Sequence, residues 1–414
     1  MSNSVVNIWR SLSPGVSATY PPAPTPGDTW NLTGGTAWVY HSPLNRRQLV
    51  RPVILADGFS AGASNIDELW DGLEENGRFR FVSELHAAGY DLILLGYDNR
   101  AASILNNGDL AVECIQRAIQ ERAGRAKLTV GGFSMGGLVT RYALAKLESA
   151  DFDHQTATYL SYDTPHTGAW LPIGVQAFAH YVKDNWGDIP IIGPIVGAFS
   201  DLINTPASRQ AMRWHLEKIG NDPSPSAERR VFIEELARVG WWPSNVRKLG
   251  VANGVGTGIG NGIIPGLTAV RSTGPGLGGT TLYTQNTGQQ IVARIQKAGD
   301  EPVLVPTNGL PDIDGAPGGL FPASEDNPGS FGVAALLMFL LDGEQAELTY
   351  PTSCFVPSVS AVAAGDIDDR TRLYREIDPA SSELDDFLCA SQNEGHTTMT
   401  RELGEWIVNQ IQKA

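Results

Sequence analysis

Short apolar runs recur along the first half of the chain, and each of them ends at residues that favour turns. Four such runs cover residues 52–56, 90–96, 128–132 and 158–162. Continuous apolar runs of this length are typical of parallel strands that are buried on both faces. The runs therefore predict a mostly parallel sheet at the centre of the molecule.

Between and after these runs, apolar residues recur with the spacing of a helix. Residues 110–122 and 135–147 each place their apolar side chains on one helical face. Strands that alternate with helices predict an α/β fold, in which helical crossovers flank the sheet. Residues 399–411 predict a further amphipathic helix. The longest apolar run, residues 331–341, is too short to span a membrane and predicts a buried helix.

The alternation is interrupted at two places. Residues 1–36 include a stretch rich in Pro, Gly, Ser and Thr, which predicts an irregular lead-in, and residues 250–279 are very rich in glycine. No fixed repeat is present. We therefore predict a core formed by residues 37–170 and 346–414, with residues 171–345 inserted over the sheet as a cap or lid.

The composition limits the kinds of binding partner and the cellular compartment that can be expected for this protein. A formal net charge of −15 over 414 residues opposes binding to nucleic acid and to anionic membranes. The three cysteines, Cys114, Cys354 and Cys389, are far apart, which argues against a zinc site and suits a reducing compartment. No secretory signal and no apolar run long enough for a membrane span are recognisable. A cytoplasmic protein without membrane insertion is expected, and its oligomeric state is left open.

The strongest chemical signal is the pattern G-x-S-x-G, formed by Gly132-Phe133-Ser134-Met135-Gly136. The pattern alone is common, but here an apolar strand precedes Ser134 and an amphipathic helix follows it. A sharp turn between strand and helix exposes the serine hydroxyl, and glycines are needed where side chains would clash. The helix N-terminus adds a positive dipole beside the hydroxyl. Ser134 is therefore the predicted nucleophile.

Two backbone N–H groups are expected to form an oxyanion hole beside Ser134. One belongs to Met135, the residue after the nucleophile. The other should come from the loop after an earlier strand. Asp57-Gly58-Phe59 directly follows the apolar run 52–56, so the N–H of Phe59 is the second predicted donor.

A histidine late in the chain should serve as the base, because the triad order in such folds is Ser, then acid, then His. His396 meets this condition, and His166, directly after the strand at 158–162, is the alternative. The acid is ambiguous. Asp163 follows that same strand, whereas Asp366 lies thirty residues before His396. Either carboxylate would orient the imidazole and stabilise its charged form.

Taken together, these motifs resemble the bacterial lipase/esterase branch of the α/β-hydrolase superfamily. The resemblance covers about residues 50–175 and 350–414 and is weak between them. It implies the α/β-hydrolase fold, with Ser134 as nucleophile and His396 as base. Many lipases carry His-Gly where this chain has Asp57-Gly58. Relatives also place an acid where this chain has Ala363, which keeps the choice between Asp163 and Asp366 open.

The predicted activity is hydrolysis of a carboxylic ester with a hydrophobic acyl group, through a Ser-His-Asp triad and an acyl-enzyme. No cofactor and no metal are expected. Tryptophans of the insertion would either line an apolar acyl pocket or form the core of the insertion. An acyltransferase or a thioesterase using the same triad is the alternative. A hydrolase-like scaffold that only binds is a third possibility.

Overall fold

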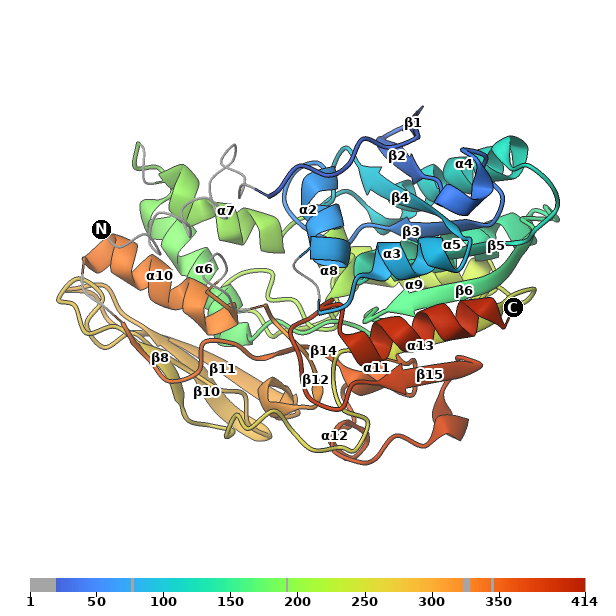
Figure 1. The fold of residues 1–414 in the computed structure, drawn as a ribbon. Coiled ribbons are helices and arrows are strands. Elements are labelled where there is room, and N and C mark those ends of the chain that lie inside the picture. Colours follow the sequence, from blue (N-terminus) through green and yellow to red (C-terminus); the bar gives the residue numbers. More distant parts are fainter. Residues whose placement is uncertain (1–19, 76–77, 191–192, 323–327, 344–345, 414) are drawn as a thin grey trace.

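The computed structural model describes residues 20–75, 78–190, 193–322, 328–343 and 346–413. Its centre is an eight-stranded sheet with the order β1-β2-β4-β3-β5-β6-β7-β15 (Figure 1). β2 pairs antiparallel with both β1 and β4, and all other neighbours in this sheet are parallel. The strands are β1 (Asp28–Leu32), β2 (Gly35–Tyr40), β3 (Pro52–Ala56), β4 (Asp91–Tyr97), β5 (Leu128–Phe133), β6 (Thr156–Tyr162), β7 (Arg247–Ala252) and β15 (Asp386–Cys389).

Helices cover both faces of the central sheet, which explains why its inner strands are mostly apolar. Alternate residues of a strand point to opposite faces. Accordingly, Ile54 packs with α4 (Ile104–Glu121) and α5 (Met135–Ser149), whereas Val53 packs with α3 (Phe81–Ala87) and α13 (Arg401–Gln412). Every residue of β3, β4 and β5 is buried.

A second apolar core lies beside the first, around a five-stranded antiparallel sheet with the order β11-β10-β9-β8-β13. Helices α6 and α10 pack on this sheet, which lies at the other end of the molecule from β4 and β5 (Figure 1). The elements are α6 (Ile173–Trp186), α7 (Gly193–Ile203), β8 (Thr268–Arg271), β9 (Thr281–Tyr283), β10 (Gly288–Ile295), β11 (Val303–Leu310), α10 (Ser330–Asp342) and β13 (Glu347–Leu348).

Short elements connect the two cores. A two-stranded sheet, β12 with β14, lies close to the end of β6 because Gly319 of β12 adjoins Asp163. The remaining elements are α2 (Ile66–Trp70), η2 (Asp71–Glu75), α8 (Pro206–Ala211), α9 (Ala227–Arg238), β12 (Gly318–Leu320), β14 (Cys354–Pro357), α11 (Ser358–Ala361), α12 (Arg370–Leu373) and the single-turn helices η1 (Pro43–Asn45), η3 (Ile313–Gly315) and η4 (Pro379–Ser381).

The four predicted strands and four predicted helices are confirmed, and so is the α/β-hydrolase fold. Two boundaries differ from the prediction. β7 lies inside the interval 171–345, yet it joins the central sheet between β6 and β15. Its sequence RKLGVA starts with two charged residues and offers only a short apolar signal. β1 lies inside the interval 1–36 as an edge strand with mostly exposed residues, so its sequence lacks a continuous apolar run.

The rest of the predicted division into core and cap stays a prediction. Within the described ranges, no helix is long and apolar enough to cross a membrane. The apolar run that was predicted as a buried helix forms α10, which has 13 residues.

Candidate active site

Ser134 lies in a sharp turn between β5 and α5. Its backbone adopts φ 52° and ψ −121°, a conformation that residues other than glycine rarely adopt. Glycine is required at the two flanking positions because a larger side chain would clash with neighbouring backbone. A Cβ on Gly132 would lie 2.4 Å from the carbonyl carbon of Gly136, and one on Gly136 would lie 2.3 Å from the Ala56 oxygen. The turn predicted from the G-x-S-x-G pattern is therefore present, with its glycines packed against neighbouring backbone.

The loop between β15 and α13 carries His396 to the serine. The Nε2 atom of His396 lies 2.7 Å from the Oγ atom of Ser134. The backbone N–H of His396 donates to the Leu320 oxygen at 2.8 Å, and the Leu320 N–H donates to the Glu394 oxygen at 2.8 Å. The Phe355 ring meets the imidazole edge to face, with centroids 4.9 Å apart. The imidazole is thus held by β12 and β14 as well as by its own loop.

Asp163 follows β6 and completes a hydrogen-bonded chain. Its Oδ2 atom lies 2.7 Å from Nδ1 of His396, and its Oδ1 atom accepts the backbone N–H of Asn253 at 3.0 Å. The side chain is fully buried. Asp163 also has a positive φ of 47°. Two of the three linked residues, Ser134 and Asp163, therefore hold strained backbone conformations, which are frequent at functional sites.

The alternatives from the sequence lie elsewhere. Asp366 is exposed, and among the described contacts no hydrogen bond joins it to His396. The charge of the Asp366 carboxylate instead acts on Arg229. Burial lowers the pKa of the Arg229 guanidinium to about 10, and the negative charge of Asp366 opposes this shift.

His166 is buried against the Trp242 ring, with centroids 4.9 Å apart, and its Nε2 atom lies 3.1 Å from the Ser161 hydroxyl. Burial, followed by the neighbouring Arg141, holds the pKa of His166 well below its usual range. His166 is therefore a neutral residue packed between a strand and a tryptophan, away from the Ser134 hydroxyl.

Of the predicted oxyanion donors, Met135 directly follows Ser134, and Phe59 follows Gly58, which lies against Ser134. Met135 is the first residue of α5, where backbone N–H groups lack a partner in the helix. Gly58 abuts the serine, since a Cβ built on it would lie 3.5 Å from the Ser134 Cβ. The N–H of Gly58 donates to the Asp57 carboxylate at 2.7 Å. Among the described hydrogen bonds, none uses the N–H of Phe59 or Met135.

The tryptophans of the middle segment do not surround Ser134. Trp170 and Trp214 are buried in the second core, with ring centroids 5.6 Å apart, and the Trp170 indole donates to Asp314 at 2.6 Å. Trp241 and Trp242 are partly buried, and both indoles donate to Glu383. Of the two roles considered for the tryptophans, the structure therefore favours packing within the cores.

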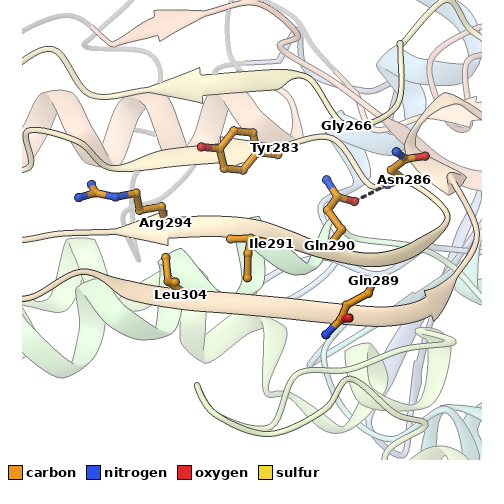
Figure 2. Close-up of a pocket in the computed structure, with 8 residues that line it drawn as sticks. All are labelled: Gly266, Tyr283, Asn286, Gln289, Gln290, Ile291, Arg294 and Leu304. Carbon is orange, nitrogen blue, oxygen red and sulfur yellow. Dashed lines mark hydrogen bonds between the residues drawn. The ribbon is translucent and has the colours of Figure 1, made fainter.

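Two of the surface cavities that described residues form do not include Ser134 in their lining. The first, of about 410 Å³, lies on the five-stranded sheet (Figure 2). Two of its polar side chains already have partners, since Gln290 bonds the backbone of Asn286 and Thr284, and Arg294 donates to the Gly279 oxygen. The second, of about 340 Å³, lies between the glycine-rich loop and Tyr374.

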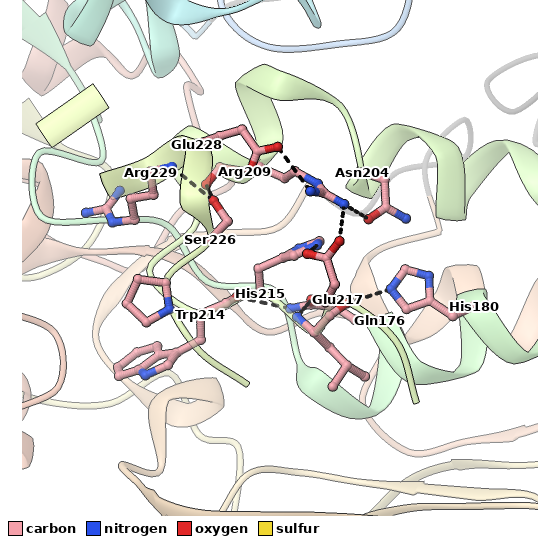
Figure 3. Close-up of polar contacts among 12 residues, drawn as sticks. Gln176, His180, Asn204, Arg209, Trp214, His215, Glu217, Ser226, Glu228 and Arg229 are labelled. Atoms are coloured by element: carbon pink, nitrogen blue, oxygen red, sulfur yellow. Dashed lines mark hydrogen bonds and ion pairs between the residues drawn. The ribbon is translucent and has the colours of Figure 1, made fainter. Parts of the chain in front are cut away.

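A polar network around Arg209 joins α8 to its surroundings (Figure 3). The Arg209 guanidinium contacts Glu217, Glu228 and the Asn204 amide. Beside it, His215 is buried, and neither of its ring nitrogens has a hydrogen-bond partner among the described residues. Burial, followed by Arg209, lowers the pKa of His215 to about 4. In the described part of the chain no group of three or more His, Cys, Asp or Glu side chains is arranged to hold a metal ion.

With this geometry in hand, the chain can be compared with known proteins. Residues 103–183 match the model of a family described as "Putative serine esterase (DUF676)". The matched segment is less than half of the chain, but it runs from the start of α4 into α6 and includes Ser134 and Asp163. It supports a serine ester hydrolase and agrees with the resemblance seen in the sequence. The search of curated proteins found no match.

Several solved structures resemble the chain in part. The lipase BlEst2 from Bacillus licheniformis is 14% identical over 55% of this chain and 73% of its own, with a TM-score of 0.31. The thermostable carboxylesterase EstE1 from a metagenomic library is 10% identical over 60% and 73%, with a TM-score of 0.33. The Pyrobaculum calidifontis esterase is 11% identical over 59% and 78%, with a TM-score of 0.30. Because these scores are low, the fold class rests on the strand order and on the turn at Ser134.

Sequence reasoning missed three residues that hold the site in place. Asn253 was missed because it follows β7, a strand that was not predicted. Phe355 and Gly319 carry no chemical signal, and they reach the site only because β12 pairs with β14 beside the end of β6.

Proposed function

We propose that the chain hydrolyses carboxylic esters with Ser134 as nucleophile, His396 as general base and Asp163 as the acid of the triad. The observation that carries the proposal is the chain of two hydrogen bonds, 2.7 Å from Ser134 to His396 and 2.7 Å from His396 to Asp163. This arrangement of nucleophile, base and orienting group is what acyl transfer through a serine requires.

Each residue then has one task. His396 takes the proton of Ser134 through Nε2 as the hydroxyl attacks the acyl carbonyl, and it returns that proton to the leaving alcohol. Asp163 accepts a hydrogen bond from the Nδ1–H group of His396, which fixes the tautomer and stabilises the imidazolium. The resulting acyl-enzyme is released by water, which His396 activates in the same way.

The developing oxyanion is stabilised by the N–H groups of Met135 and Phe59. Met135 adds the positive end of the α5 dipole. The position of Gly58 against Ser134 supports Phe59 as the second donor, since the N–H of Gly58 itself is taken by Asp57. No step requires a cofactor.

The first experiment is hydrolysis of p-nitrophenyl esters of increasing acyl length, together with labelling by a fluorophosphonate probe. Ser134→Ala should abolish both. Ser358→Ala is a matched control, because the Ser358 hydroxyl is also buried but has no hydrogen-bond partner in the described part of the chain, and this variant should keep both activities. Activity that survives in Ser134→Ala would contradict the proposal. Labelling of Ser134 without ester hydrolysis would instead favour the transfer of an acyl group to another acceptor.

A further inference from the structure

The loop between β3 and α2 contains a buried acid that the reaction scheme does not use. Asp57 is the first residue after β3 and is only 6% exposed. Its Oδ1 atom accepts the N–H of Gly58 at 2.7 Å, and its Oδ2 atom accepts the Ser64 hydroxyl at 2.6 Å. Because Asp57 and Ser64 are the two ends of the loop 57–64, this carboxylate closes the loop.

Both ends of the loop are also attached to β4. The N–H of Asp57 donates to the Leu95 oxygen at 2.9 Å. Ser64 bonds Tyr97 twice, since its N–H donates to the Tyr97 oxygen and its hydroxyl accepts the Tyr97 N–H, each at 2.8 Å. The Ser64 hydroxyl therefore links the Asp57 carboxylate to the backbone of a central strand.

Arg100 fastens the tip of the same loop. Its backbone N–H donates to the Gly62 oxygen at 2.8 Å, and its guanidinium lies 3.7 Å from the Asp57 carboxylate and 3.2 Å from Glu68. Burial raises the pKa of Asp57 to about 6, although Arg100 and Ser64 oppose the shift. Keeping a charge in this place therefore costs stability, which natural proteins often accept where function requires it.

The loop lies against the proposed nucleophile. A Cβ on Gly58 would lie 3.4 Å from the Phe133 oxygen and 3.5 Å from the Ser134 Cβ. Because Asp57 binds the N–H of Gly58, that group is withdrawn from Ser134, and the next N–H in the chain is that of Phe59. We propose that Asp57 is a positioning residue, which closes the loop 57–64 and thereby fixes the Phe59 N–H for the oxyanion. This inference rests on the proposed function.

The chain offers a matched control in Asp314. It is fully buried, burial raises its pKa to about 6, and it accepts one backbone N–H from Gln285 and one indole N–H from Trp170. Asp314 thus resembles Asp57 in burial and bonding, but it lies outside the loop 57–64. Asp57→Ala and Asp314→Ala should lower the melting temperature in a similar way.

Their kinetics should differ. With p-nitrophenyl acetate, Asp57→Ala should lower kcat about tenfold to a hundredfold with KM within about threefold, as expected when an oxyanion donor is misplaced. Asp57→Asn should be intermediate, since one amide oxygen can accept only one of the two bonds cleanly. Asp314→Ala should keep kcat within about twofold of the wild type, because the oxyanion loop is untouched.

Equal kcat values for Asp57→Ala and Asp314→Ala would overturn the inference. If Asp57→Ala does not fold, Ser64→Ala takes its place, because it removes the bridge and keeps the acid. A kcat within about twofold of the wild type for Ser64→Ala would then overturn the inference. These outcomes are separable from failure of the proposed function, which would appear as unchanged hydrolysis by Ser134→Ala.

Discussion

Gly319 is the position where a single methyl group should disconnect the proposed triad. A Cβ on Gly319 would lie 2.0 Å from Oδ2 of Asp163, the atom that binds His396. To reach an ordinary contact near 3.4 Å, the carboxylate must move by about 1.4 Å. A bond of 2.7 Å lengthened by about that much is no longer a hydrogen bond. Because a misplacement of about 1 Å can cost about a hundredfold in rate, Gly319→Ala should lower kcat by about that factor.

The neighbouring residue provides the control. A Cβ on Gly318 would lie 2.4 Å from the Val356 oxygen and 2.6 Å from the Cys354 sulfur, so it crowds β14 but not Asp163. Gly318→Ala and Gly319→Ala should each destabilise the fold by about 1–3 kcal/mol through overpacking, which thermal unfolding measures. Only Gly319→Ala should lose kcat on p-nitrophenyl acetate beyond what the unfolded fraction explains.

The effect must also depend on Asp163. In the Asp163→Ala background, adding Gly319→Ala should change kcat by less than about threefold, because the carboxylate that it displaces is already absent. Equal loss of kcat in Gly318→Ala and Gly319→Ala, or full additivity with Asp163→Ala, would refute the reasoning.

Three further predictions concern single side chains. Asp163→Asn should lower kcat by about 10⁴-fold, whereas Asp366→Asn should stay within about twofold; the reverse order would make Asp366 the acid. Phe355→Leu removes the ring that packs against His396 and should lower kcat about twofold to tenfold. KM should stay unchanged if the ring only orients the imidazole. His215 should make the fold sensitive to acid. Because its folded pKa of about 4 is below the ordinary value of 6.5, its contribution is complete above pH 6.5 and is lost as the pH falls toward 4. Between pH 6.5 and pH 4, the free energy of unfolding of His215→Gln should therefore fall by about 1–2 kcal/mol less than that of the wild type, as measured by chemical unfolding. Parallel curves of unfolding free energy against pH for the two proteins would contradict the assignment.

The sequence predicted those parts of the molecule that local patterns encode. The buried strands around Ser134 are mostly apolar, and the turn requires glycines at fixed positions, so both can be recognised in the sequence. β7 was missed because its flanking residues are polar and the following glycines mask its end. Without β7, the residue after it, Asn253, could not be placed beside Asp163.

The choice between the two acids needed the structure. Asp163 follows a predicted strand, Asp366 lies thirty residues before His396, and the positions of both along the chain are compatible with a triad. What separates them is that β6 lies next to β5 in the sheet, whereas β14 belongs to a different, two-stranded sheet. Strand order is a property of long-range pairing, which local residue patterns do not encode.

The hydrogen bonds at the centre of the site join residues that are very far apart along the chain. Ser134 and His396 are separated by 262 positions, and Asp163 and His396 by 233. During synthesis, domains generally fold from the N-terminal side first. The turn at Ser134 can therefore form before the ribosome has added β15 and His396. The Ser134 hydroxyl meets His396, its proposed base, only after β15 has joined β7 and the loop that follows β15 has closed. A growing chain therefore carries its proposed nucleophile in an unactivated state until these residues have been added.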